Sequence, residues 1–432
     1  MNVPFLQKCR HIEHASRNNN DEENTLIITT SGDENSSSST SGSATFFRTC
    51  LNGLNALSGV GILSIPYALA SGGWLSIILL FAIAMAAFYS GILMKRCMDS
   101  NHNIKTYPEI GHLAFGNLGR TAVSLSMYTE LYLVATGFLI LEGDNLDNLF
   151  PNTEIMGSII GGKKLFVVVV GIIIMPTVWL DDLSLLSYVS GSGVVASGVI
   201  VVAVFVTGVV DESVGFREKG RVVDLGGTPT AVSLYAFCYC AHPVFPSLYN
   251  SIKDKKQFSK VLLVCFVLST AAYAFMAIIG YLMFGSKVES QITLNLPKNK
   301  ITSQIAIYTT LLNPIAKYAL MVTPITNALK SLLPPQHMNN RFITISISTA
   351  LVFSTVAVAV AVPFFGSLTS LVGAFLSVTA SIIMPCACYL KISGTYKELG
   401  FETVAIVTII LIGVVIGVFG TYNALAEIIN QL

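Results

Sequence analysis

Apolar residues along this chain gather into long runs separated by short polar segments. A helix that crosses the hydrocarbon core of a bilayer needs about 20 predominantly apolar residues. Eleven runs of roughly that length follow a polar start of the chain. They lie approximately at residues 46–70, 74–93, 121–142, 165–180, 184–210, 229–250, 260–284, 301–329, 341–362, 365–390 and 401–426. The pattern predicts an all-α membrane protein with eleven transmembrane helices.

Two of these runs, the first and the sixth, contain helix-interrupting residues near their middles. The first has Gly59 and Gly61 followed by Pro66, and the sixth has Pro243 and Pro246. Glycine tolerates unusual backbone dihedral angles, and proline lacks the N–H that a helix interior needs. Because the breaks are five spans apart and five is odd, a repeated five-span unit would cross the membrane in the opposite direction. The pattern therefore predicts an inverted repeat whose broken helices meet near the bilayer midplane, as in transporters.

The same runs define the expected domain organisation. Residues 1–45, rich in Asn, Ser, Thr and acids, are expected to form a disordered cytosolic tail. Residues 46–426 form the transmembrane transporter domain. It divides into repeat one, repeat two and an extra helix, with a short luminal C-terminus after it, at residues 46–210, 229–390, 401–426 and 427–432.

Composition agrees with a protein in a lipid bilayer, and charge gives its orientation. The chain is 53% hydrophobic and 11% charged, whereas soluble domains are about 25% charged. Its net charge of +1 argues against a nucleic-acid partner, since no basic stripe is present to neutralise phosphates. Of the 25 Lys and Arg residues, sixteen lie in the tail or the loops on its side of the membrane and eight on the opposite side. The positive-inside rule places the N terminus in the cytosol.

A glutamate and a lysine lie near the middles of two predicted spans. Glu130 is near the centre of the third span, and Lys317 is in the middle of the eighth. An ionisable group at the centre of a membrane helix costs at least about 2.5 kcal/mol, so it faces a cavity or a partner. We expect both side chains to face the transport core and to couple protons to transport. The alternative is an ion pair that only holds the third and eighth spans together.

The broken helices offer a binding site for a small zwitterion. N–H groups at a half-helix N terminus bind a carboxylate, and unwound carbonyl groups accept from an ammonium. A single interruption is more often a packing kink, but two interruptions five spans apart favour a binding site. Asn55 and Ser58 supply side chains at the first break, and Cys240 and Ala241 lie at the second.

His242, beside the second break, has two interpretations. An imidazole that titrates near neutrality would relay protons. A neutral ring would simply hydrogen-bond to exposed backbone groups. The sequence leaves both open.

The sequence predicts no metal site and no cofactor. The C-x-C pairs at residues 238–240 and 386–388 lack the spacing of zinc or redox motifs. No Gly-rich loop has the spacing of a phosphate-binding loop, so coupling to an ion gradient remains as the energy source. No nucleophile, base and orienting group can be assembled, which argues against an enzyme.

Three segments resemble a known family. The run Phe46–Ile77, with its Asn-x-x-Ser-Gly-x-Gly-Ile-Leu-x-Ile-Pro core, resembles the first span of the amino acid/auxin permease family. Ala236–Asp254 and Asn313–Pro324 resemble the sixth and eighth spans of its plant and fungal vacuolar amino acid transporter branch. The resemblance covers about residues 46–426. It implies a LeuT-like five-plus-five inverted repeat with an extra C-terminal helix, and exchange of neutral amino acids against protons.

The resemblance also implies residue roles. In sodium-coupled relatives a metal ion bridges the first and eighth helices, so the Lys317 ammonium would stand in for that ion. The family's substrate contacts on the first span fall on Asn55, Ser58, Gly59, Val60 and Gly61. The expected substrate-binding residues of the sixth span are Cys240, Ala241 and His242, and the expected helix-break residues are Pro66, Pro243 and Pro246.

The tail contains the pattern of an acidic dileucine sorting signal, with Glu22 followed by Leu26 and Ile27. A trafficking adaptor would read it in a cytosolic tail, which together with the resemblance favours the vacuolar membrane. The expected function is therefore amino acid/proton antiport across that membrane, by a monomer. The alternatives are a proton-coupled symporter that exports from the vacuole or acts at another membrane such as the plasma membrane, and an amino acid sensor on the same fold. A channel is disfavoured because no repeated filter is present.

Overall fold

The computed structural model describes residues 44–101, 103–151, 162–179, 185–211, 213–334, 340–398 and 400–431, all within the unit Ser41–Leu432. These residues are helical apart from turns, loops and one isolated parallel bridge between Ala44 and Ile252. Across these ranges, nine helices are long and apolar enough to cross a membrane, and a bent pair makes a tenth span. An all-α membrane protein is confirmed. The count of eleven spans and the inverted repeat stay predictions.

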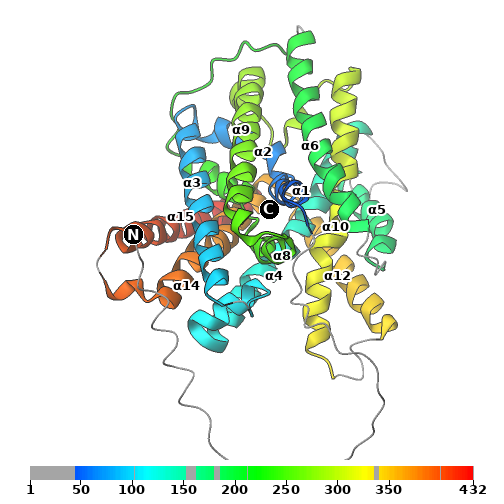
Figure 1. The fold of residues 1–432 in the computed structure, drawn as a ribbon. Helices are drawn as coiled ribbons and strands as arrows, with labels where there is room; N and C mark the ends of the chain where they lie inside the picture. Colours follow the sequence, from blue (N-terminus) through cyan, green and yellow to red (C-terminus); the bar gives the residue numbers. More distant parts are fainter. Residues whose placement is uncertain are drawn as a thin grey trace, which may run out of the picture. The chain divides into compact units, whose positions relative to one another are not determined.

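The helices follow one another with short 3-10 turns between them (Figure 1). The earlier elements are α1 Phe46–Leu57, α2 Gly61–Gly72, α3 Ser76–Ser100, α4 Tyr107–Leu149, α5 Gly162–Ile174, η3 Met175–Trp179, α6 Leu185–Val210, α7 Thr228–Cys238, η4 His242–Val244, α8 Phe245–Ser251, η5 Lys255–Gln257 and α9 Phe258–Phe284. The later elements are η6 Gly285–Lys287, η7 Ile292–Asn295, α10 Ile301–Ser331, α12 Arg341–Ala361, α13 Phe365–Leu371, η8 Val372–Ser377, η9 Thr379–Ile383, α14 Met384–Ser393, η10 Thr395–Lys397 and α15 Phe401–Gln431.

The first predicted span is a broken helix. α1 and α2 meet at an angle of 51° across residues 58–60. Ser58 has φ −74° and ψ 60°, outside the helical region, and Gly59 follows it. Pro66 lies inside α2, beyond the break, and is buried. The chain therefore leaves the helix at its Ser-Gly segment and not at its proline.

α4 extends beyond the third predicted span at both ends. It begins at Tyr107 and turns at Gly116, whose φ of +64° favours glycine. The predicted span lies after this turn. The helix then continues to Leu149, past the acidic residues at which the apolar run ends. It can do so because Asp144 pairs with Lys163 at the start of α5.

The sixth predicted span is interrupted as well. α7 ends at Cys238, and α8 begins at Phe245 after a short 3-10 turn. By contrast, α9 is a single helix of 27 residues. It packs against α1, α2 and α3, and Figure 1 shows it in green beside the blue helices of the first span. An intact helix therefore supports both halves of a broken one.

Two π-helical turns, η8 and η9, lie within the tenth predicted span. The wider turns of a π-helix often occur at functional sites. Here the Tyr107 hydroxyl donates to the Ala380 carbonyl at 2.6 Å, and the Ser90 hydroxyl donates to the Ser381 carbonyl at 2.6 Å. These bonds fasten α3 and the start of α4 to the tenth span.

α15 corresponds to the eleventh predicted span and packs against α7, α13 and both π-helical turns. Near its end, Thr230 of α7 donates to Glu427 and accepts from Asn423, both at 2.9 Å. Near its beginning, Glu402 pairs with Arg96 of α3. The helix is thus fastened at both ends.

Candidate functional site at two helix breaks

The break in the first span lies against the end of α7, where the second break begins. A Cβ added to Gly61 would lie 2.6 Å from Sγ and 3.3 Å from Cα of Cys238, so only glycine permits this approach. α2 and α7 also pack along one another. The structure therefore brings Gly61 of the first break against Cys238, which ends α7 just before the second break and its predicted residues 240–242.

Open space lies beside the first break. A Cβ added to Gly59 would meet no atom within 4 Å. The first N–H groups of α2 have no acceptor within their own helix, and the positive end of its dipole lies there. The last carbonyl groups of α1, at the negative end of that helix, lie on the other side of the break. The carboxylate of a dipolar ligand would find complementary charge at the start of α2.

Lys317 of α10 hydrogen-bonds to carbonyl groups of the first break. Its Nζ donates to the Ser58 carbonyl at 2.9 Å and approaches the Asn55 carbonyl at 3.4 Å. The side chain is only 5% exposed. Because α1 ends at these carbonyls, the ammonium lies at the negative end of the helix. The structure thus joins the first and eighth predicted spans through a fixed cation.

α6 forms a further wall of this site, which the sequence did not single out. A Cβ added to Gly193 would overlap Asn55 Oδ1 and lie 3.0 Å from Lys317 Cε. The Ser197 hydroxyl reaches the Ser58 carbonyl at 3.5 Å. Gly193 belongs to a Ser- and Gly-rich stretch of α6. That composition signals close helix packing but does not reveal which glycine faces the break.

Glu130 of α4 lies at the second break. Its side chain is 2% exposed, and Oε1 accepts from the Ser377 hydroxyl of η8 at 2.6 Å. The Cys240 thiol also hydrogen-bonds to this carboxylate. Among the ion pairs of the described residues, none joins Glu130 to Lys317. In this structure the two groups therefore do not form the locking ion pair, and Glu130 lies at the second break while Lys317 lies at the first.

His242 is fully buried and connects three elements. Its Nε2 lies 3.0 Å from the Ala87 carbonyl and 2.9 Å from the Ser90 hydroxyl of α3. A carbonyl only accepts, so Nε2 carries the proton. Ser90 in turn donates to the Ser381 carbonyl of η9. These contacts favour the interpretation of His242 as a neutral donor that ties the second break to α3, while the proton relay stays an untested prediction.

We expect His242→Gln to leave the pH profile of activity unchanged and to lower activity by no more than about threefold. A glutamine amide keeps a donor for the Ala87 carbonyl, whereas His242→Ala loses this hydrogen bond, at about 0.5–1.5 kcal/mol, and leaves that carbonyl with the Ser90 hydroxyl. Initial rates measured across pH for both variants check this. If His242→Gln shifts the pH profile, imidazole titration takes part and the neutral-donor interpretation fails.

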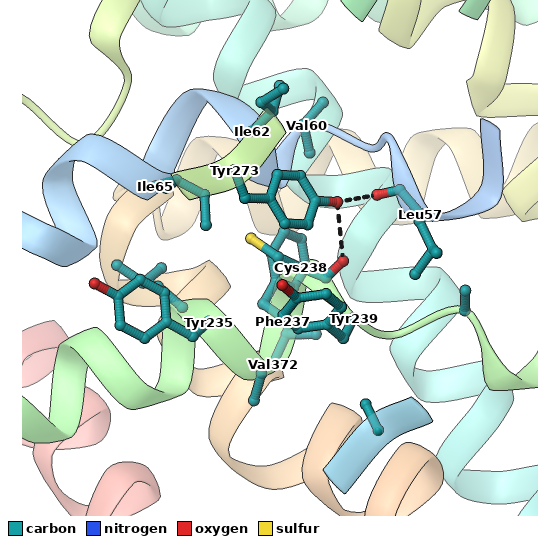
Figure 2. Close-up of a cluster of buried hydrophobic side chains, with 14 of the residues drawn as sticks. Leu57, Val60, Ile62, Ile65, Tyr235, Phe237, Cys238, Tyr239, Tyr273 and Val372 are labelled. Carbon is teal, nitrogen blue, oxygen red and sulfur yellow. Dashed lines mark hydrogen bonds between the residues drawn. The ribbon is translucent and has the colours of Figure 1, made fainter. Parts of the chain in front are cut away.

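A tyrosine that the sequence did not single out connects the two breaks. The Tyr273 hydroxyl of α9 donates to the Leu57 carbonyl and also lies 3.1 Å from the Cys238 carbonyl (Figure 2). Leu57 ends α1 and Cys238 ends α7. No motif marks this residue, because tyrosines recur throughout the spans and only the fold shows which one faces both breaks.

A second polar cluster lies away from the breaks, where α4 ends. Asp144 pairs with Lys163, whose Nζ also donates to the Pro363 carbonyl before α13. Gln291 of the α9–α10 connection donates to Asp144 at 2.9 Å and accepts from Asn145 at 2.6 Å. The cluster joins α4, α5 and two connections that are far apart in sequence.

The other predicted residues fall in two groups. Val60 and Ala241 are buried beside the breaks, Pro243 lies in η4 and Pro246 lies in the first turn of α8. The predicted sorting signal, Glu22, Leu26 and Ile27, lies outside the described residues, as does nearly all of the predicted tail.

Comparison with known proteins gives consistent matches over nearly the whole chain. Residues 42–426 match a family described as "Transmembrane amino acid transporter protein". The chain is 57% identical over 393 residues to "Amino acid transporter AVT1J" of Arabidopsis thaliana, covering 90% of this chain and 93% of that protein. It is 54% identical to "Amino acid transporter AVT1I" of the same plant, covering 90% and 97%. "Amino acid transporter AVT1B" is 45% identical, covering 91% and 73%.

Proposed function

The chain belongs to the amino acid/auxin permease family, and we propose that it is a proton-coupled antiporter of mainly neutral amino acids at the vacuolar membrane. Its relatives at 54% and 57% identity are named as amino acid transporters. The observation that carries the proposal is the contact between two helix breaks, with open space at Gly59 and one buried ionisable group at each break.

We propose the LeuT-like five-plus-five architecture with α15 as the extra helix. The two broken spans lie five predicted spans apart in sequence and touch at Gly61 and Cys238. In inverted-repeat transporters, such discontinuous helices hold the substrate near the bilayer midplane. The cluster of Asp144, Lys163 and Gln291 would close one opening while the other is accessible.

The proposed site binds both charged ends of an amino acid. The N–H groups at the start of α2, at Val60 and Gly61, would donate to the carboxylate and are assisted by the helix dipole. A carbonyl group at the second break would accept from the ammonium, because Lys317 already occupies carbonyl groups of the first break. The side chain of the substrate would extend into the space beside Gly59. Backbone groups recognise the part that all amino acids share, which agrees with a class of neutral substrates.

Lys317 would hold the first break in shape without a metal ion. A positive charge beside the Ser58 and Asn55 carbonyls replaces the cation that sodium-coupled relatives bind. Because a charge-assisted hydrogen bond is stronger than a neutral one, the ammonium would stabilise the unwound segment throughout the cycle. The proposal therefore couples transport to protons and not to sodium.

Glu130 would carry the coupled proton. When charged it accepts from Ser377 and Cys240, and when protonated it becomes a donor. This change would alter the hydrogen bonds that connect α4 and η8 to the second break. In antiport into an acidic vacuole, Glu130 would take up a proton from the lumen, release it to the cytosol and thereby reset the site.

Glu130→Gln tests this coupling role. In proteoliposomes with an acidic interior, a gradient of one pH unit supports up to about tenfold accumulation per exchanged proton, which is about 1.4 kcal/mol. We expect the variant to lose gradient-driven accumulation of labelled alanine and leucine while it still exchanges them at equal concentrations, because a glutamine takes up no proton.

Glu142→Gln provides the matched control, since Glu142 is another buried acid of α4 that makes no contact with the breaks in the hydrogen bonds described. It should accumulate substrate as the wild type does. If Glu130→Gln retains wild-type accumulation, Glu130 does not couple. If the wild type shows no net flux in either direction but binds amino acids, the protein is a sensor and the transport proposal fails.

A further inference from the structure

One hydroxyl group on α9 touches both helix breaks. Tyr273 donates to the Leu57 carbonyl at the end of α1 and lies 3.1 Å from the Cys238 carbonyl at the end of α7 (Figure 2). Those two carbonyls belong to different predicted spans that are about 180 residues apart. Their common contact is a side chain of a third, unbroken helix.

The tyrosine ring is held in place by neighbours on one face of α9. Its ring meets Tyr239 edge-on, with centroids 5.5 Å apart and planes at 71°. Tyr239 stacks on Phe266 at 5.8 Å and shares a hydrogen bond of 2.8 Å with Thr270. Phe266, Thr270 and Tyr273 recur at spacings of four and three, so they lie on the same face of the helix. This packing fixes where the hydroxyl points.

A phenol has one proton, and two carbonyl groups converge on it. Only one of the two carbonyl groups can accept this proton in a full hydrogen bond at a time. The other carbonyl then has only a weaker electrostatic contact with the hydroxyl group. Both carbonyls nevertheless stay close to the same oxygen atom. Any movement of α1 relative to α7 must therefore break at least one of these contacts.

We propose that Tyr273 is a positioning residue that sets the distance between the two breaks and thereby the shape of the amino acid site. The effect on an amino acid site rests on the proposed function. The positioning of the two breaks by Tyr273 does not depend on it. α9 stays in place as an unbroken helix, and the Tyr273 hydroxyl holds the ends of α1 and α7 at fixed distances from it. Tyr273 itself need not touch the substrate.

Tyr273→Phe removes the hydroxyl and keeps the ring. We expect KM for labelled alanine and leucine to rise about tenfold, which is about 1.4 kcal/mol, with Vmax per folded molecule changed by less than about threefold. The matched control is Tyr235→Phe, which removes another buried hydroxyl. That hydroxyl is bonded to Ser76 at 3.1 Å, away from the breaks. It should leave KM within about twofold of the wild type. A neutral hydrogen bond of this kind contributes about 1 kcal/mol to the stability of the fold, and this one does not contact the breaks.

Hydrogen exchange tests the positioning independently of transport. In Tyr273→Phe, amides of segments 57–63 and 238–242 should exchange faster than in Tyr235→Phe, because both breaks lose their common tether. Faster exchange with an unchanged KM would overturn the link to the substrate site. Unchanged exchange at both breaks would overturn the positioning role itself, even where the wild type transports amino acids. A wild type without transport would refute the proposed function, while the exchange result still decides whether Tyr273 positions the breaks.

Discussion

Replacing Lys317 with methionine should lower amino acid flux per folded molecule about 10- to 100-fold. The substitution keeps an unbranched side chain but removes the ammonium that donates to the Ser58 carbonyl at 2.9 Å. A hydrogen bond to a charged group contributes about 1.5–3 kcal/mol, and each 1.4 kcal/mol is a factor of ten. The carbonyls at the end of α1 would also lose the positive charge that offsets the helix dipole.

Lys317→Arg should not restore the flux. A guanidinium is a planar fork and not a compact charge, and Lys317 Cε already lies 3.0 Å from the position that a Cβ of Gly193 would occupy. Lys330→Met is the control, because it removes a lysine from the last turn of the same helix. Initial rates of labelled alanine and leucine uptake, divided by the amount of folded protein, make the comparison. Wild-type flux in Lys317→Met would show that the ammonium has no part in transport.

Gly193→Ala should lower flux about tenfold or more at normal expression. The added methyl group would overlap Asn55 Oδ1 and approach Lys317, so α6 would have to move away from the first break. Overpacking of this kind typically costs about 1–3 kcal/mol. The strain would displace Asn55 and Lys317, which lie at the first break. We therefore expect the variant to lose transport activity while it still folds.

Gly198→Ala is the matched control for this prediction. It adds the same methyl group to the same helix, at a position where a Cβ would meet no atom within 4 Å. Uptake and thermal stability in detergent, measured side by side, separate loss of the site from loss of the fold. Equal uptake by the two variants would mean that the space at Gly193 does not matter to function.

The sequence predicted a break in the first span from a local combination of Gly59, Gly61 and Pro66. Glycines at these positions weaken a helix, and the structure bends by 51° there, although the same Ser-Gly-x-Gly pattern at residues 190–193 lies within the continuous helix α6. Lys317 could be singled out for a similar reason, since a lone cation in an apolar run requires a partner. Neither signal depends on knowing what lies next to it in the folded chain.

The partners of these groups could not be predicted, because they depend on how each helix is rotated about its axis. The residues alone do not direct Lys317 to the Ser58 carbonyl and away from Glu130, and only the family resemblance implied that its ammonium lies between the first and eighth spans. Tyr273 and Gly193 were missed for the same reason. Each acts on segments that lie far away along the chain.

The ends of α4 illustrate a different limit. Apolar runs were ended where acidic residues begin, so the third span was expected to stop at Glu142. In the structure the helix continues to Leu149, because Asp144 and Asn145 find partners in Lys163 and Gln291. A hydropathy scale includes the free-energy cost of burying a polar or charged residue. It does not include the ion pairs and hydrogen bonds that offset this cost in the folded chain.

An experimental structure with a bound neutral amino acid tests the central claim most directly. The account predicts the ligand between the two breaks, with its carboxylate at the N–H groups of Val60 and Gly61 and its side chain beside Gly59. Lys317 should remain on the Ser58 carbonyl. A ligand bound elsewhere, or first and sixth spans that run as continuous helices, would contradict the account.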